Sequence, residues 1–198
     1  MTEVSINKQA RLSEHFSLGE LTKSRHAEIY NIPSHVAIEN LKRVCTWLEE
    51  LRRRYNLRYV CGSVSPPELG GVRGGLNSGM YSASSDHPAH PGTPPNLGGE
   101  INTDTPIIIN SGYRSPELNK KVGGSTTSNH LTGCAVDIRV YGIEQAMRYA
   151  VILMDYADET RQDYDELLIE RNKSGGYWLH FAVRPRDNRR KTSFILKA

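Results

Sequence analysis

The strongest constraint on the fold of this chain is a short strand pattern with an acid at its centre. Between residues 134 and 140 the side chains alternate between two faces. One face carries Cys134, Val136, Ile138 and Val140, and the other carries Ala135, Asp137 and Arg139. An acid in an apolar strand is costly unless a partner compensates its charge. Asp137 therefore needs a partner, and the small side chain of Ala135 leaves space for one on the same face.

A metal ion would be such a partner, and two histidines are placed to share it. His130 lies in the loop before the strand, and His180 lies in a second alternating segment, residues 177–183, on the same face as Trp178 and Ala182. Two histidines and one aspartate leave a fourth position open, which is typical of a catalytic zinc rather than a structural one. The sequence thus predicts one Zn²⁺ bound by His130, Asp137 and His180.

The spacing of these residues is more specific than the ligand set alone. Residues 128–137 read Ser-x-His-x-x-Gly-x-Ala-x-Asp, residues 178–180 read Trp-x-His, and residues 111–115 read Ser-Gly-Tyr-Arg-Ser. Together these segments resemble the motifs of the zinc D-Ala-D-Ala carboxypeptidase family. That family includes the vancomycin-resistance D-Ala-D-Ala dipeptidases and the phage L-Ala-D-Glu endolysins. The resemblance extends from about Phe16 to Val183, with one atypical insertion.

The resemblance implies a zinc metallopeptidase with the metallo DD-peptidase (hedgehog-like) fold. Its substrate would be a peptidoglycan stem peptide, cleaved at D-amino acids by carboxypeptidase or endopeptidase action during cell-wall lysis or remodelling. An alternative stays open, in which the chain is a catalytically inactive, zinc-containing module that binds the cell wall or belongs to a phage structure. This alternative rests on Tyr177, which occupies the position where many relatives carry an acid.

Zinc-assisted hydrolysis needs a general base to accept a proton from the attacking water. The candidate is Glu170, because a hairpin that closes around Ser174 and Gly175 would place it nearly opposite His180. A subset of the family, with an Ile-x-Glu strand before Trp-x-His, resembles this arrangement. The other interpretation is that Glu170 is an edge-strand charge or an ion-pair partner.

Three further residues are candidates for contact with the substrate. The guanidinium of Arg114 can bind a carboxylate through two donors or stabilise an oxyanion, and the alternative is a plain surface ion pair. Ser128 is suited either to hydrogen-bond the substrate or to cap its turn. Trp178 is suited either to form a wall of the pocket or to pack in the core.

The order of elements predicts an α+β fold, with a small mixed or antiparallel sheet and helices on one side. Helices are expected at 18–24, 35–54, 116–122 and 142–159, and strands at 106–110, 134–140, 165–171, 177–183 and 192–197. Helical spacing predicts a buried face on the helix at 35–54, formed by Ala37, Leu41, Val44, Cys45, Leu48 and Leu51. The buried residues expected on the helix at 142–159 are Ile143, Met147, Ala150, Val151 and Met154.

A length of 198 residues fits a single domain, residues 1–198, with one insertion at about 62–104. The insertion holds nine of the seventeen glycines and six of the ten prolines and shows no apolar periodicity, so it is expected to be a flexible loop that folding does not need. His87 and His90 within it have metal-ligand spacing, but the flanking prolines argue against a designed site.

The net charge of +3 is too small to favour nucleic acid, and we expect a monomer without a nucleic-acid partner. A basic cluster near the C-terminus is expected to be an exposed tail: Arg184, Arg186, Arg189, Arg190 and Lys191. The three cysteines lack the spacing of a disulfide framework or a cysteine zinc site, and Cys45 and Cys134 are expected to be buried.

The first twelve residues are polar and lack the apolar core of a signal peptide, and no apolar run has the length of a membrane span. The expectation is synthesis in the cytoplasm without a signal peptide, with action at the cell wall.

Overall fold

The structure is a computed structural model that describes residues 7–60 and 104–196. The predicted insertion, with His87 and His90, lies outside the described residues except for Asp104. The helices are α1 (Leu18–Leu21), α2 (His35–Tyr55), the π-helix η1 (Asn56–Val60), α3 (Pro116–Lys121), the 3₁₀-helix η2 (Asn129–Thr132) and α4 (Ile143–Thr160). The strands are β1 (Ile109–Ser111), β2 (Ala135–Arg139), β3 (Glu166–Arg171), β4 (Tyr177–Ala182) and β5 (Lys191–Leu196).

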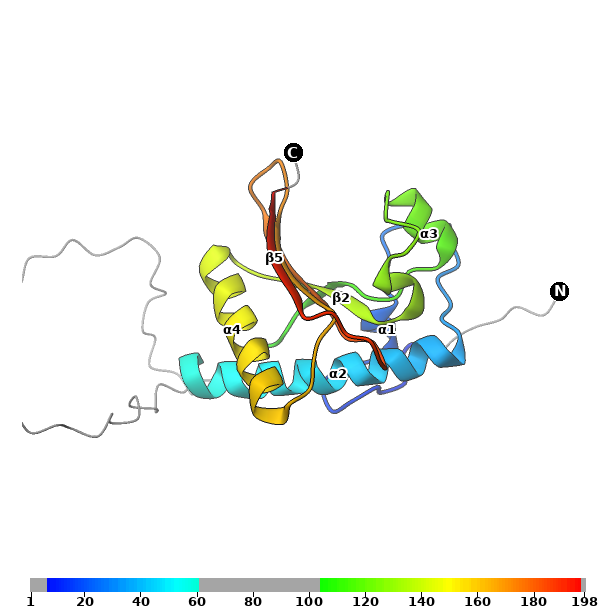
Figure 1. Ribbon diagram of the computed structural model, residues 1–198. Coiled ribbons are helices and arrows are strands. Elements are labelled where there is room, and N and C mark those ends of the chain that lie inside the picture. The colour runs from blue at the N-terminus through cyan, green and yellow to red at the C-terminus, as the bar shows by residue number, and fades with distance from the viewer. Residues whose placement is uncertain (1–6, 61–103, 197–198) are drawn as a thin grey trace, which may run out of the picture.

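The five strands form one mixed sheet in the order β1-β2-β4-β3-β5. Neighbouring strands are antiparallel, except that β5 runs parallel to β3. Figure 1 shows α4 on one side of the sheet, α3 on the other, and α2 running across its base. The predicted α+β class is confirmed, but the expectation of helices on one side is wrong for α3, which lies on the opposite side of the sheet from α4.

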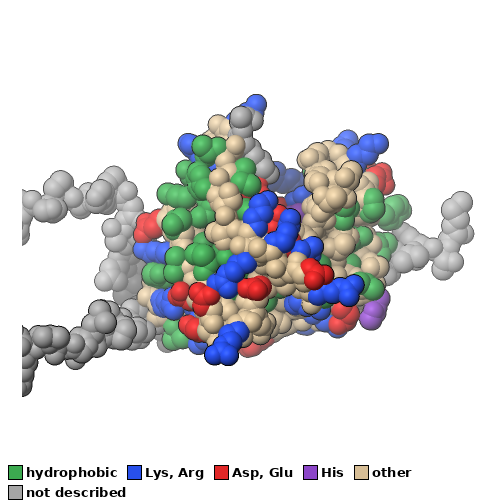
Figure 2. Space-filling view, viewed as in Figure 1, with side chains coloured by type: hydrophobic (Ala, Val, Ile, Leu, Met, Phe, Trp, Pro, Cys, Tyr) green, Lys and Arg blue, Asp and Glu red, His purple; other side chains and the backbone are tan. Residues whose placement is uncertain are grey.

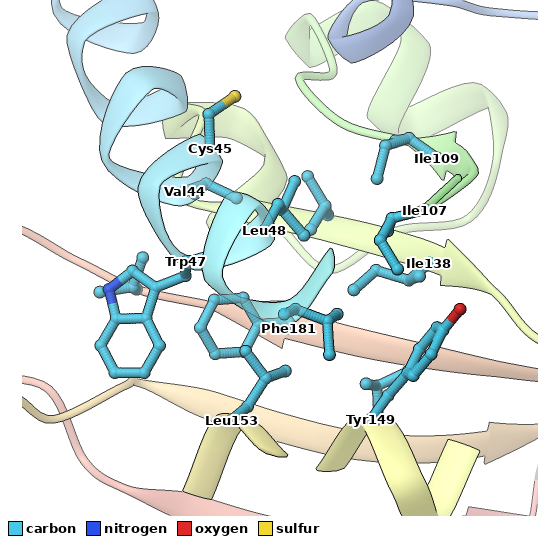
Figure 3. Close-up of a cluster of buried hydrophobic side chains, with 14 of the residues drawn as sticks. Val44, Cys45, Trp47, Leu48, Ile107, Ile109, Ile138, Tyr149, Leu153 and Phe181 are labelled. Carbon is cyan, nitrogen blue, oxygen red and sulfur yellow. The ribbon is translucent and has the colours of Figure 1, made fainter. Parts of the chain in front are cut away.

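The core lies between the sheet and the two long helices, α2 and α4 (Figure 3). Helix α2 begins at Ser34, whose hydroxyl accepts a hydrogen bond from the amide of Ala37. All six residues predicted to be its buried face are buried. Trp47 on α2 contacts Phe181 on β4, with ring centroids 5.4 Å apart, so helix and sheet are joined by aromatic packing.

The predicted buried face of α4 is wrong for three of its five residues. Ile143, Met147 and Val151 are exposed. The buried residues of the helix are instead Ala146, Tyr149, Ala150, Ile152, Leu153 and Ala157. Because α4 is apolar around most of its circumference, helical spacing alone did not determine which stripe meets the sheet.

The basic cluster near the C-terminus is exposed as predicted, apart from the partly buried Arg184, but it is not a loose tail, because three of its arginines bind acids of the folded domain. Arg184 and Arg189 form ion pairs with Asp165, which is fully buried, and Arg190 pairs with Asp158 and Asp163. A buried carboxylate is costly unless cations and hydrogen bonds compensate its charge. These contacts fix the start of β5 beside β3. Cys45 and Cys134 are buried and unpaired, as predicted.

Within the described parts of the chain, no helix combines the length and apolar character that crossing a membrane requires.

Candidate metal centre

The structure brings His130, Asp137 and His180 together, although each comes from a different element. Each residue offers one ligand atom, and the three atoms lie within 4.8 Å of one another. Asp137 is at the middle of β2 and stands directly opposite His180 of β4. Direct cross-strand partners share one face of a sheet, so this register places both side chains on the face away from the core. His130 reaches the same point from η2.

The backbone around His130 fixes the orientation of its ring. Nδ1 lies 2.6 Å from the carbonyl oxygen of Gly112, and Nε2 lies 3.3 Å from Oδ1 of Asp137. A carbonyl only accepts, so Nδ1 carries the proton and donates it, which leaves Nε2 free to act as a ligand. Gly133 ends η2 with φ +73°, and a Cβ there would meet the carbonyl oxygen of Ala37 at 2.5 Å. Glycine at 133 therefore allows the chain to turn from His130 into β2.

His180 is held between two carboxylates. Its Nδ1 lies 2.9 Å from Oδ1 of Asp137, and its Nε2 lies 3.5 Å from Oε2 of Glu166. Burial alone would lower the pKa of His180, but the hydrogen bonds with Asp137 and Glu166 raise it to about 9. Burial would likewise raise the pKa of Asp137, but His130 and His180 hold it well below its usual range. The carboxylate is therefore ionised, as a metal ligand must be.

The donor set fits a divalent metal ion. Imidazole nitrogen and carboxylate oxygen are ordinary ligands of zinc, and three protein ligands leave a position for water or substrate. The Gly112 carbonyl and the Glu166 carboxylate hold the second nitrogen of each ring, an arrangement that orients histidine ligands in metal sites. These residues can therefore hold a metal ion.

Arg114 contacts the predicted ligand carboxylate directly. Its Nη2 lies 2.5 Å from Oδ2 of Asp137, and its Nε donates to the hydroxyl of Ser111 at 2.9 Å. The ion pair is largely buried, with side-chain exposures of 17% for Arg114 and 14% for Asp137. It is thus not the plain surface ion pair that was the alternative, and the guanidinium is fixed at the edge of the metal site.

A cavity of about 560 Å³ opens beside these residues. In Figure 2 this face of the molecule is hollowed between the part that carries α3 and the strands at the C-terminal end, and Lys and Arg side chains gather there. Besides the three candidate ligands, Arg114, Ser128, Glu170 and Trp178 line the cavity. All the predicted site residues are therefore in one place.

The predicted position of Glu170 within the hairpin is wrong by two residues. Arg171 pairs with Tyr177, so the hairpin is centred on Ser174, Leu168 stands opposite His180, and Glu170 stands opposite Trp178. Pairing Glu170 with His180 would need a turn centred on Gly175, and a shift of the centre by one residue, to Ser174, moves the pairing by two. An even shift keeps the face, so Glu170 remains on the metal side, buried at 6% exposure.

Glu166, which sequence reasoning missed, flanks His180 on the other side. Its carboxylate also accepts from Asn129 at 3.1 Å and pairs with Arg189 and Lys191 at 3.1 and 3.3 Å. The hydrogen bond with His180 lowers the pKa of Glu166 to about 2 against the effect of burial. Strand alternation was the available signal, since residues 166, 168 and 170 share a face.

Ser128 and Trp178 both lie at the cavity, each with a defined local role. The Ser128 hydroxyl caps η2 by accepting from the amide of His130 at 3.3 Å, and the same residue lines the cavity. Trp178 is partly exposed and belongs to the cavity wall rather than to the core cluster. The wall position of Trp178 therefore agrees with the pocket interpretation.

Part of the chain matches a known protein family. Residues 100–163 match the sequence profile of the family described as Peptidase M15, and this stretch contains Arg114, Ser128, His130 and Asp137. His180 and Glu170 lie beyond the matched stretch. A search of curated proteins found no match. This part of the chain is therefore similar to peptidase M15, and the structure adds a His-Asp-His cluster that could hold a metal ion.

Proposed function

We propose that this chain is a zinc-dependent peptidase that hydrolyses peptide bonds at D-amino acids in peptidoglycan stem peptides, acting at the cell wall. The observation that carries the proposal is the position of His130, Asp137 and His180 at one cavity, together with an arginine and a buried glutamate. The match to peptidase M15 supports the reaction class. The proposal covers both carboxypeptidase and endopeptidase action.

His130, Asp137 and His180 would hold the metal ion through nitrogen and oxygen atoms. When bound, zinc supplies Lewis acidity that lowers the pKa of a bound water toward about 7. The Glu170 carboxylate accepts the proton of the attacking water and later delivers it to the leaving amine. The Arg114 guanidinium, held by Asp137 and Ser111, donates hydrogen bonds to the carbonyl oxygen as negative charge develops on it.

The proposal assigns the remaining carboxylate, Glu166, to a different role. Its four contacts, with His180, Asn129, Arg189 and Lys191, hold the carboxylate in place and stabilise its charge. A carboxylate that already accepts from these four groups is poorly placed to take a proton from water. Glu166 is therefore a positioning residue that orients His180, and Glu170 is the general base.

Purified muropeptides test the proposal. The zinc-loaded chain is expected to release a shortened peptide, a chelator should abolish the release, and added zinc should restore it. Chromatography with mass spectrometry identifies the product and the cleaved bond. If the zinc-loaded chain releases no product from any muropeptide, the proposed activity is wrong and the inactive wall-binding module is the better account.

A further inference from the structure

A second cavity, of about 550 Å³, adjoins the metal cavity and differs from it in charge, because the metal cavity has both acids and cations in its lining. The two cavities share Arg114 and Val122 in their walls. The metal cavity includes three acids in its lining, whereas Asp and Glu are absent from the described residues that line the second one. Its charged side chains are cations, namely Lys23, Arg25, Arg114 and Arg139.

Three of these cations have no carboxylate partner among the described residues. Ion pairs within residues 7–60 and 104–196 leave out Lys23, Arg25 and Arg139, although many other lysines and arginines there are paired. Arg139 is nevertheless fixed, because its Nε donates to Oδ1 of Asn110 at 3.2 Å. Its terminal nitrogens are left to bind a ligand. Arg139 and Asp137 share a face of β2, so Arg139 extends the metal face toward this cavity.

The segment that carries Lys23 and Arg25 is firmly attached beside the Arg114 loop. The amide of Tyr113 donates to the carbonyl of Leu21 at 2.7 Å, and Gly112 approaches that carbonyl so closely that an added Cβ would lie 2.3 Å from it. Asn31 donates to the carbonyls of Thr22 and Tyr113, both at 2.9 Å. The backbone that carries Lys23 and Arg25 is therefore fixed relative to the Arg114 loop.

We propose that this second cavity is a subsite for a carboxylate of the substrate peptide, bound by Lys23, Arg25 and Arg139. The inference rests on the proposed peptidase function and adds to it a preference for substrates that carry a negative charge outside the metal cavity. Neighbouring unpaired cations favour an anion, and guanidinium groups suit the two oxygens of a carboxylate. A peptide that spans both cavities passes Arg114, which stands between them.

The test compares a stem peptide, L-Ala-γ-D-Glu-L-Lys-D-Ala-D-Ala, with two amidated forms. One form is amidated at the D-Glu α-carboxyl and the other at the C-terminal carboxyl, so the two carboxylates are distinguished. Each is measured with the zinc-loaded full chain and with Arg25→Gln and Arg139→Gln. One of the two amidations is expected to weaken binding or hydrolysis of the peptide by the parent about tenfold, which is the effect of losing one charged hydrogen bond. The same amidation should change binding or hydrolysis by the two variants much less. Arg186→Gln is the matched control, because Arg186 is 89% exposed and lines neither cavity.

The measured quantity is the ratio between the unmodified and the amidated peptide. It is a ratio of kcat/KM values where the peptide is hydrolysed and a ratio of Kd values where it is not. If the parent hydrolyses none of the three peptides, the proposed activity is wrong. The Kd ratio then still shows whether the second cavity binds a carboxylate. The subsite is wrong if neither amidation changes the parent, if the variants keep the full amidation effect, or if no form binds. It is also wrong if Arg186→Gln loses the discrimination as the two cavity variants do.

Discussion

At the scale of single residues, Asp137 is the centre of the site. Its Oδ1 faces both His130 and His180, and its Oδ2 accepts from Arg114. The sequence predicted a ligand role for Asp137 from an acid in an apolar strand, and strand alternation was enough to place its side chain on the face where the structure has His180. The contacts of Glu166 were not predictable in the same way, because they depend on where β5 begins.

The roles of the two glutamates can be separated by matched amide substitutions. Glu170→Gln should keep the fold and the zinc but lower peptide hydrolysis by about a hundredfold, the usual contribution of a general base. Glu166→Gln weakens the hold on His180, so zinc affinity should fall by at least about tenfold while turnover at saturating zinc is largely kept. Calorimetric zinc titration and kcat measure the two effects. The reverse pattern would make Glu166 the base.

Arg114→Lys tests the second catalytic assignment. Lysine keeps the charge but lacks the planar guanidinium that contacts both Ser111 and Asp137. We expect kcat/KM for peptide hydrolysis to fall by at least about tenfold, equivalent to about 1.4 kcal/mol of transition-state stabilisation. Arg186→Lys serves as the control at an exposed position. Unchanged turnover in Arg114→Lys would mean that the arginine has no part in the reaction.

At the scale of elements, the sequence predicted single helices and strands better than it predicted how the strands pair. The long helix α2, the strand β2 and the hairpin of β3 and β4 were predicted within a few residues because each has its own periodicity and caps. The register of the hairpin was not predicted correctly, because the five polar or glycine residues in its turn allow more than one position for the centre of the turn. The parallel pairing of β5 with β3 was also not evident from the sequence, because it depends on the ion pairs of Asp165.

Asp165→Asn tests how strongly those ion pairs hold the elements together. Asp165 is fully buried, binds Arg184 and Arg189, and accepts from Asn129 in η2 at 2.7 Å. Breaking a buried pair leaves cations uncompensated, so the unfolding free energy at pH 7 should fall by about 3 kcal/mol. Asp187→Asn is the control, since Asp187 is 84% exposed and its ion pair is 3.9 Å long. Equal stability of the two variants would contradict a structural role for Asp165.

The pH dependence of this effect has a definite sign. Burial would raise the pKa of Asp165, but hydrogen bonds from Arg189 and Asn129 hold it below its usual range. A lowered pKa in the folded state contributes stability above the unfolded value, about 3.9, and that contribution is lost as pH falls through the folded value. The stability difference between parent and Asp165→Asn should therefore be full at pH 7 and shrink as the pH falls below about 4. Chemical denaturation at both ends of this range measures it.

At the scale of the whole molecule, the two faces of the sheet have different roles, one in the core and one at the candidate metal site. One face packs on α2 and α4 and forms the core, and the other carries Asp137, His180, Glu166 and Glu170, with His130 reaching it from η2. The sequence predicted both faces of β2 and β4, but not that two cavities of different charge would meet at Arg114, because that requires residues from many separate segments to come together.

Metal content tests the central claim most directly. Parent protein and His180→Ala are loaded with zinc, freed of excess metal by gel filtration, and analysed for zinc per chain by mass spectrometry. We expect one zinc per chain in the parent and near-complete loss in His180→Ala, because two remaining protein ligands bind zinc weakly. Circular dichroism should show that the variant is folded. A folded His180→Ala chain that retains one full equivalent of zinc would contradict the account.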